Sequence, residues 1–330
     1  MAGKFRTALM GALAASTLIG AAGMVGAQDA REMVTVVKLS GIAWFNRMEE
    51  GVREYAEATG NDATQVGAAT ADAALQVQLI EDLIARGVDA INVVPNSPQT
   101  LEPVLKRALD NNIVVVGHEG ATLENITYDL EAFDNKAYGE HLMEALAQKM
   151  GGEGEYAVFV GYLTSVTHNA WVDAAIAYQE ANYPNMTLVG GKQESAEQQQ
   201  QAYAKMRELL RTYPNIKGMQ GSAGEDVVGA ALAVEEAGLN DQISIVGTSL
   251  PSVSGPYLET GDIDMISFWD PAKAGYAMNV VAAKAMNGET IETGADLGVE
   301  GYNEVRVDGK VIYGQAWVDV TADNMNDYDF

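Results

Sequence analysis

Lys38 and the aromatic pair Trp44 and Phe45 are the first residues whose types and spacing could bind a small molecule. Lys38 lies near the end of a β-rich run, and Trp44, Phe45 and Asn46 open the helical pattern that follows. Small-molecule sites combine apolar walls with a few placed polar groups, and these four residues supply both. A lysine at the end of a buried strand needs a partner for its ammonium, which favours a functional role. Packing is the alternative interpretation of Trp44 and Phe45.

Residues that could perform covalent or metal chemistry are sparse. The chain has no cysteine, which removes disulfides, thiolate metal sites and cysteine nucleophiles. It contains no phosphate loop, no HExxH helix and no GxSxG elbow. The glycine-rich residues 151–154 precede a strand pattern, so they predict a turn and not a nucleotide site. The spacing of His118, His141 and His168 indicates neither a metal site nor a triad. We therefore expect no catalytic residue, no metal and no cofactor.

The elements that must position these residues alternate between strand and helix patterns. A first series of strands is predicted at residues 34–39, 64–68, 90–94 and 113–116, and a second at 156–160, 187–189, 216–220 and 243–247. Helical patterns between them, such as residues 75–85, 169–181 and 197–210, predict parallel sheets covered by helices on both faces. No Pro- or Ser-rich linker separates the two series, which favours a hinge over a flexible tether.

The first residues have the pattern of an export signal. Lys4 and Arg6 precede an uncharged run of small and apolar residues, 7–25, and residues 25–27 form a small-x-small cleavage site. A membrane span needs about 20 strongly apolar residues, and this run is largely Ala, Gly, Ser and Thr. We predict a signal peptide over residues 1–27, cleaved near Ala27, and a periplasmic protein without a lipidated cysteine.

The chain is strongly acidic. Its formal net charge is −26 at pH 7, and removal of Lys4 and Arg6 with the signal makes it −28. Such a surface repels nucleic acid, so we expect no nucleic-acid partner. About 300 mature residues exceed one comfortable core and favour two domains.

Four segments, in their order along the chain, resemble the type I periplasmic sugar-binding proteins of ABC importers. These segments are residues 38–45, 96–98, 105–108 and 268–270. The closing residues 328–330 are similar to the group that binds autoinducer-2 and rhamnose, and residues 134–135 with Gly139 resemble the ribose-binding pattern. The resemblance covers essentially the whole mature chain. It implies an α/β fold, periplasmic binding protein type I, with two doubly wound parallel-sheet lobes joined by a three-strand hinge and closing on a ligand.

The resemblance also implies where the lobes divide. Hinge crossings would fall near Leu130, Trp269 and Thr293. The N-terminal lobe would then comprise residues 28–131 and 270–293, and the C-terminal lobe residues 132–269 and 294–330.

Further ligand-binding residues follow from the resemblance. The autoinducer-2 binders carry an aspartate at the position of Glu119, which implies a carboxylate that accepts ligand hydroxyls. Their Asp-Gln pair corresponds to His168 and Asn169, in a loop that is one residue shorter here. A surface position for Glu119, and helix capping by Thr167 or His168, are the alternatives.

The remaining implied positions are less specific. Ser222 and Gly224 stand where the autoinducer-2 group has Pro and Ala, so backbone groups would serve there. Trp269 and Asp270 lie at a hinge crossing and could close the back of the cleft, with packing as the alternative for Trp269.

The differences from the autoinducer-2 group at Glu119, at His168 and Asn169, and at Ser222 and Gly224 change the pocket's hydrogen bonding. Sites that bind hydroxyls discriminate strongly among ligands. We therefore expect a small sugar or polyol, such as a rhamnose-like deoxyhexose or a pentose, in preference to autoinducer-2. The expected partners of this monomer are ABC permease transmembrane subunits, with a chemoreceptor as a second candidate. The alternatives are autoinducer-2 uptake or sensing, the effector domain of a sugar-responsive repressor, and a secreted sugar-acting enzyme. A repressor would need a DNA-binding head where the signal peptide stands.

Overall fold

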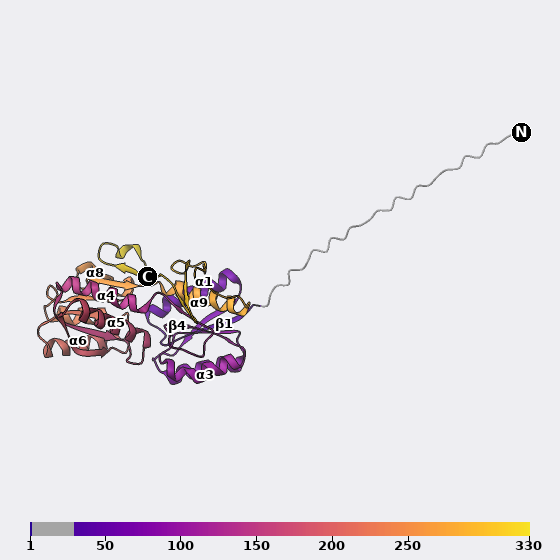
Figure 1. Ribbon diagram of the computed structural model, residues 1–330, viewed down its shortest axis with the longest axis horizontal. Helices are drawn as coiled ribbons and strands as arrows, with labels where there is room; N and C mark the ends of the chain where they lie inside the picture. The colour runs from indigo at the N-terminus through magenta and orange to yellow at the C-terminus, as the bar shows by residue number, and fades with distance from the viewer. Residues whose placement is uncertain (2–29) are drawn as a thin grey trace.

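The computed structural model describes Met1 and residues 30–330, so the predicted signal peptide, apart from Met1, and its predicted cleavage point lie outside the described residues. The described residues form two lobes, each built around one mainly parallel sheet with helices on both faces (Figure 1). Among residues 30–330, no helix has the length and apolarity that a bilayer span requires.

The first lobe is built on a seven-stranded sheet of order β11-β12-β5-β4-β3-β1-β2. Its strands are β1 (Glu32–Val37), β2 (Asp62–Gly67), β3 (Ala90–Val93), β4 (Val114–His118), β5 (Tyr128–Glu131), β11 (Arg306–Asp308) and β12 (Val311–Tyr313). Helices α2 (Ala73–Arg86) and α3 (Pro98–Asp110) cover one face, and α1 (Ala43–Thr59) and α9 (Pro271–Met286) cover the other. The buried strands are rich in β-branched residues, as expected of a sheet covered on both sides.

The second lobe repeats this design on a six-stranded sheet of order β13-β10-β9-β8-β6-β7. Its strands are β6 (Glu153–Val160), β7 (Asn185–Glu194), β8 (Ile216–Gly221), β9 (Ser244–Thr248), β10 (Met265–Phe268) and β13 (Val318–Val320). Helices α4 (Asn135–Met150) and α5 (Val166–Asn182) pack on one face, and α6 (Gln199–Thr212) and α7 (Asp226–Glu236) on the other. The short helix α8 (Pro251–Thr260) packs beside α7, and a 3₁₀ turn (Met325–Asp327) lies near the C-terminus.

Glycines bring one pair of helices into close contact in each lobe. A Cβ on Gly51 of α1 would lie 1.8 Å from the carbonyl oxygen of Ala272, at the start of α9. A Cβ on Gly139 of α4 would lie 2.1 Å from the carbonyl oxygen of Trp171 in α5. Both helix pairs therefore approach backbone to backbone, at a separation that only glycine permits.

The chain passes between the two sheets in three short segments, residues 132–134, 269–270 and 314–317. The third segment corrects the expectation of a crossing near Thr293 and the assignment of residues 294–313 to the C-terminal lobe. β11 and β12 form an antiparallel hairpin, and β12 pairs with β5 of the first sheet. Of the chain after α9, only β13, which pairs with β10, and the tail after it belong to the second lobe.

Candidate functional site

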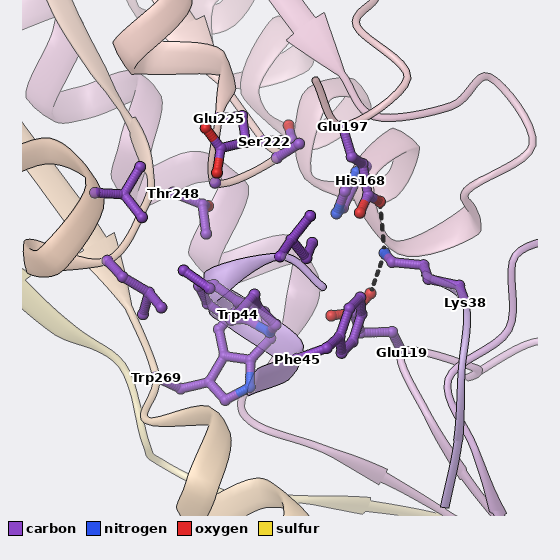
Figure 2. Close-up of a pocket in the computed structure, with 16 residues that line it drawn as sticks. Lys38, Trp44, Phe45, Glu119, His168, Glu197, Ser222, Glu225, Thr248 and Trp269 are labelled. Atoms are coloured by element: carbon purple, nitrogen blue, oxygen red, sulfur yellow. Dashed lines mark hydrogen bonds and ion pairs between the residues drawn. The ribbon is translucent and has the colours of Figure 1, made fainter. Parts of the chain in front are cut away.

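A cavity lies between the lobes, where the carboxyl ends of strands from both sheets meet (Figure 2), and the space there that no atom fills, open solvent at its mouth included, is about 470 Å³. Parallel α/β sheets place ligand sites at this edge. The lining residues follow the strand ends or open the next helix: Lys38, Ile42, Ala43, Trp44, Phe45, Glu119, His168, Glu197, Ser222, Ala223, Gly224, Glu225, Thr248, Leu250, Val253 and Trp269.

Lys38 is the charged centre of the cavity. It follows β1, and its Nζ lies 3.0 Å from Oε2 of Glu119, which follows β4 in the same lobe. The same Nζ lies 2.9 Å from Oε1 of Glu197, on the loop after β7 of the other lobe. Exposure of the three residues is 3%, 7% and 5%. An ion pair shielded from water therefore joins the two lobes across the cavity, as the dashed lines of Figure 2 show.

Burial and the ion pairs shift the pKa values of these groups in different directions. Burial lowers the pKa of the Lys38 ammonium, but the two carboxylates outweigh it and hold the pKa above its usual range. For Glu119, burial raises the pKa and the Lys38 charge lowers it, with a net lowering. For Glu197 burial outweighs Lys38, so its pKa is raised. Glu197 is thus the carboxylate that takes up a proton more readily.

Both carboxylates that contact Lys38 extend from backbone in the left-handed region. The φ angle is 57° at Glu119 and 53° at Glu197, and Ala196 has a φ of 55°. Such angles are uncommon for residues other than glycine and cost free energy. The Thr167 hydroxyl donates to the Glu119 carbonyl at 2.8 Å, which is a second contact between the lobes. The loops that carry the carboxylates are thus held in strained conformations that face the cavity.

His168 presents one hydrogen-bond donor to the cavity. The Gly161 N–H donates to its Nδ1 at 3.1 Å, which places the proton of the neutral ring on Nε2. Burial, and then the charge of Lys38, lower the pKa of His168 to about 3. The ring is therefore neutral at physiological pH.

Two tryptophans form the apolar wall. The rings of Trp44 and Trp269 meet edge to face, with centroids 4.6 Å apart, and both are buried. The Trp269 indole N–H donates to Nε2 of His118 at 3.3 Å, and Nδ1 of His118 bonds the Leu130 carbonyl. His118 is not among the lining residues, but it fixes the orientation of the Trp269 ring behind them.

Two polar atoms of the wall have neither a hydrogen-bond partner nor an ion pair within the described part of the chain. They are Nε1 of Trp44 and Oγ of Ser222, both buried. Because buried polar groups are normally satisfied, these atoms mark places where a bound molecule could accept or donate. Together with Lys38, Glu119 and Glu197, they give the cavity donors and acceptors above an aromatic wall, which suits a small molecule bearing several hydroxyls.

The cavity brings together eight of the residues singled out from the sequence and leaves three outside. The eight are Lys38, Trp44, Phe45, Glu119, His168, Ser222, Gly224 and Trp269. Asn46 is exposed and faces a groove between α1 and β2. It follows the buried Phe45 on α1, and the helical rotation from one residue to the next points its side chain away from the cavity. Asn169 bonds the carbonyls of its own loop and accepts from Nζ of Lys192 at 2.9 Å. Asp270 caps α9 and forms two bonds with the Arg47 guanidinium.

Glu197 is the main cavity residue that the sequence analysis missed. The strand before it was predicted to end at Val189 and a helix to begin at Glu197, whereas β7 continues to Glu194 and α6 begins at Gln199. Glu197 therefore lies on the loop after a strand end, where a functional residue is expected, and not in a helix. Among the described residues, no group of three or more His, Asp or Glu side chains is arranged to hold a metal ion.

Comparison with known proteins places the chain in a family. The family model described as a periplasmic binding protein domain matches residues 33–290. A D-ribose/D-allose-binding protein of Pseudomonas aeruginosa is 26% identical over 277 residues, 80% of this chain and 85% of that protein. A xylitol-binding protein of Mycolicibacterium smegmatis is 26% identical over 300 residues, 87% of this chain and 83% of that protein.

Solved structures share the fold. A solute-binding protein of an ABC transporter from Clostridium phytofermentas, with bound L-rhamnose, superimposes with a TM-score of 0.82 at 23% identity, covering 91% of this chain and 98% of that one. LsrB from Clostridium saccharobutylicum, in complex with AI-2, has the same TM-score at 21% identity, covering 91% and 100%. Because the family model spans most of the chain and the two-lobed fold agrees with it, the chain belongs to the periplasmic binding protein family, whose members carry solutes and are not enzymes.

Proposed function

We propose that this protein is the substrate-binding component of a bacterial ABC importer, and that it holds a small uncharged sugar or polyol between its lobes. It closes around the ligand by hinge motion and delivers it unchanged to the transmembrane permease. A rhamnose-like deoxyhexose, a pentose or a pentitol is the expected ligand class. The export signal expected over residues 1–27 supports action in the periplasm, and we expect the protein to act as a monomer.

The observation that carries this proposal is the composition of the interlobe cavity. Lys38 and Glu119 of the first lobe and Glu197 and His168 of the second provide donors and acceptors for hydroxyl groups. The Trp44 and Trp269 rings provide the flat apolar surface against which sugar C–H faces pack. Names of related proteins, which include ribose, allose and xylitol binders, support the same ligand class.

Thermal denaturation of the mature protein tests the proposal. L-rhamnose, D-ribose, D-allose, D-fucose, D-galactose, xylitol and autoinducer-2 are added singly in excess. A ligand present at a hundred times its Kd adds roughly 2.7 kcal/mol to the free energy of unfolding, which raises the Tm by about 5 °C for a protein of this size. One sugar or polyol should do so and be recovered unchanged afterwards. No shift with any compound would refute the proposal. A shift with autoinducer-2 alone would show that the ligand is autoinducer-2 and not a sugar or polyol.

A matched pair of variants separates the cavity from the rest of the surface. Glu119→Gln removes a carboxylate that lines the cavity, and the shift should fall with it. Glu49→Gln removes an exposed carboxylate of α1 and should leave the shift unchanged. Equal shifts in the two variants would place the ligand outside this cavity.

A further inference from the structure

The cavity has an excess of carboxylates over cations. Its lining contains one lysine, Lys38, and three glutamates, Glu119, Glu197 and Glu225. The remaining titratable group of the lining, His168, is neutral because burial holds its pKa at about 3. Lys38 already contacts two of the carboxylates, at 3.0 and 2.9 Å. Even without Glu225, the closed cavity therefore carries one uncompensated negative charge.

Glu197 is the source of this excess. Glu119 and Lys38 belong to the same lobe and form a balanced pair whether the lobes are open or closed. Glu197 comes from the other lobe, so its carboxylate joins them only when the lobes close. The left-handed backbone at Glu197 holds that loop in an uncommon conformation that faces Lys38. Closure thus adds a second carboxylate to a site that needs only one for neutrality.

Helix N-termini oppose this charge only in part. The first turns of α1 and α5 face the cavity and favour anions. At α7 the N–H groups of Ser222 and Ala223 are already taken by Oδ2 of Asp226, at 3.1 and 2.8 Å. A helix terminus changes the affinity for an anion by up to about 5-fold. A carboxylate about 5 Å from a ligand anion changes it by roughly 250-fold at an effective dielectric constant of 20.

We propose that Glu197 is a specificity-determining residue that rejects sugar acids. The inference rests on the proposed function, because it concerns which members of the sugar and polyol class are admitted. A ligand carboxylate offers acceptors alone, so beside Glu197 and Glu119 it either meets like charge or requires Glu197 to take up a proton first, a cost that a neutral ligand does not incur. A hydroxyl at the same position donates to either oxygen. Neutral polyols and aldoses are thus accepted, and the aldonates and uronates derived from them are excluded.

The experiment compares each neutral ligand with the acid made by oxidising one of its terminal carbons. Isothermal titration at pH 7.5 measures the Kd of xylitol with D-xylonate, D-ribose with D-ribonate, and D-galactose with D-galacturonate. The pair that contains the ligand found in the thermal panel decides; if that ligand is L-rhamnose, its partner is L-rhamnonate. The wild-type protein should bind the neutral member about 10-fold more tightly or better, which is what remains after two helix termini offset one carboxylate.

Three variants assign this preference to Glu197. Glu197→Gln removes the excess charge while keeping the side chain's size. The ratio of the acid's Kd to the neutral ligand's Kd should then fall to about 1 or below. Glu197→Asp keeps the charge and should retain the preference. Glu49→Gln is the matched control, because Glu49 is an exposed carboxylate of α1 that does not line the cavity, and it too should retain the preference.

The outcomes separate the two proposals. If no neutral sugar or polyol binds the wild-type protein, the proposed function fails and the inference fails with it. If the wild-type protein binds a neutral ligand and its acid equally, the function stands and the inference is overturned. The same holds if Glu197→Gln keeps the wild-type preference, or if Glu49→Gln loses it as Glu197→Gln should.

Discussion

Replacing Lys38 by methionine tests the charged centre of the cavity. The change removes an ammonium that lies 3.0 and 2.9 Å from two carboxylate oxygens, and leaves Glu119 and Glu197 almost entirely shielded from water. Removing one partner of a buried ion pair typically costs about 3–5 kcal/mol. Part of the cost is relieved if the lobes separate and water again solvates Glu197. We therefore expect Lys38→Met to lower the free energy of unfolding by about 3 kcal/mol.

The assay is urea unfolding of the ligand-free mature protein, followed by tryptophan fluorescence. The double variant Lys38→Met, Glu119→Gln should recover most of the lost stability, because it removes the charge left unpaired in the first lobe. The stability of Lys38→Met should also rise as the pH falls from 8 to 5, because burial without a cation raises the pKa of the two carboxylates above the unfolded value and protonation then neutralises them. If Lys38→Met stays within about 1 kcal/mol of the wild type, or if Glu119→Gln does not rescue it, the three side chains do not form the buried cluster described above.

Three further predictions concern the frame around the cavity. Gly51→Ala, which would stabilise an ordinary helix, should instead destabilise the protein by about 1–3 kcal/mol in urea unfolding, because the added methyl meets a backbone carbonyl of α9; an unchanged or higher stability would show that α1 and α9 are further apart. Burial raises the pKa of Asp129 from its usual 3.8 to about 7. Its favourable contribution to folding stability is therefore complete below pH 4 and is lost as the pH rises through 7. Asp129→Asn should therefore be more stable than the wild type at pH 8 and lose that advantage at pH 5, and parallel pH profiles would contradict this. Ligand should change the tryptophan emission of the wild type, and Trp269→Phe should reduce that change, whereas an undiminished signal would place the ligand away from this wall.

The alternation of strand and helix patterns was enough to predict two series of parallel strands covered by helices, and the family resemblance supplied the two-lobed arrangement. Lys38, Glu119 and Ser222 each follow a strand directly, as the rule for open α/β sheets expects. Of these, only Lys38 was singled out from the pattern, and the family resemblance singled out Glu119 and Ser222. Asn46 shows the limit of that rule. The buried positions of α1 include Trp44, Phe45 and Met48, and helical periodicity places residue 46 off that face.

Other features depend on tertiary contacts that no local pattern carries. The hairpin of β11 and β12 has strands of three residues each, which are too short for a periodic signal, and its attachment to β5 places it in the first lobe. Glu197 was missed for a related reason. β7 runs through two glycines, Gly190 and Gly191, with positive φ angles, which in the sequence mark the end of a strand and not an irregularity within it.

A crystal structure of the mature protein with the sugar or polyol that gives the largest thermal shift tests the central claim most directly. The account predicts one ligand molecule between the lobes, packed against Trp44 and Trp269, with hydroxyl groups bonded to Lys38 and Glu119. A ligand bound elsewhere, with the Lys38 cluster closed on itself and the cavity free of ligand density, would contradict it.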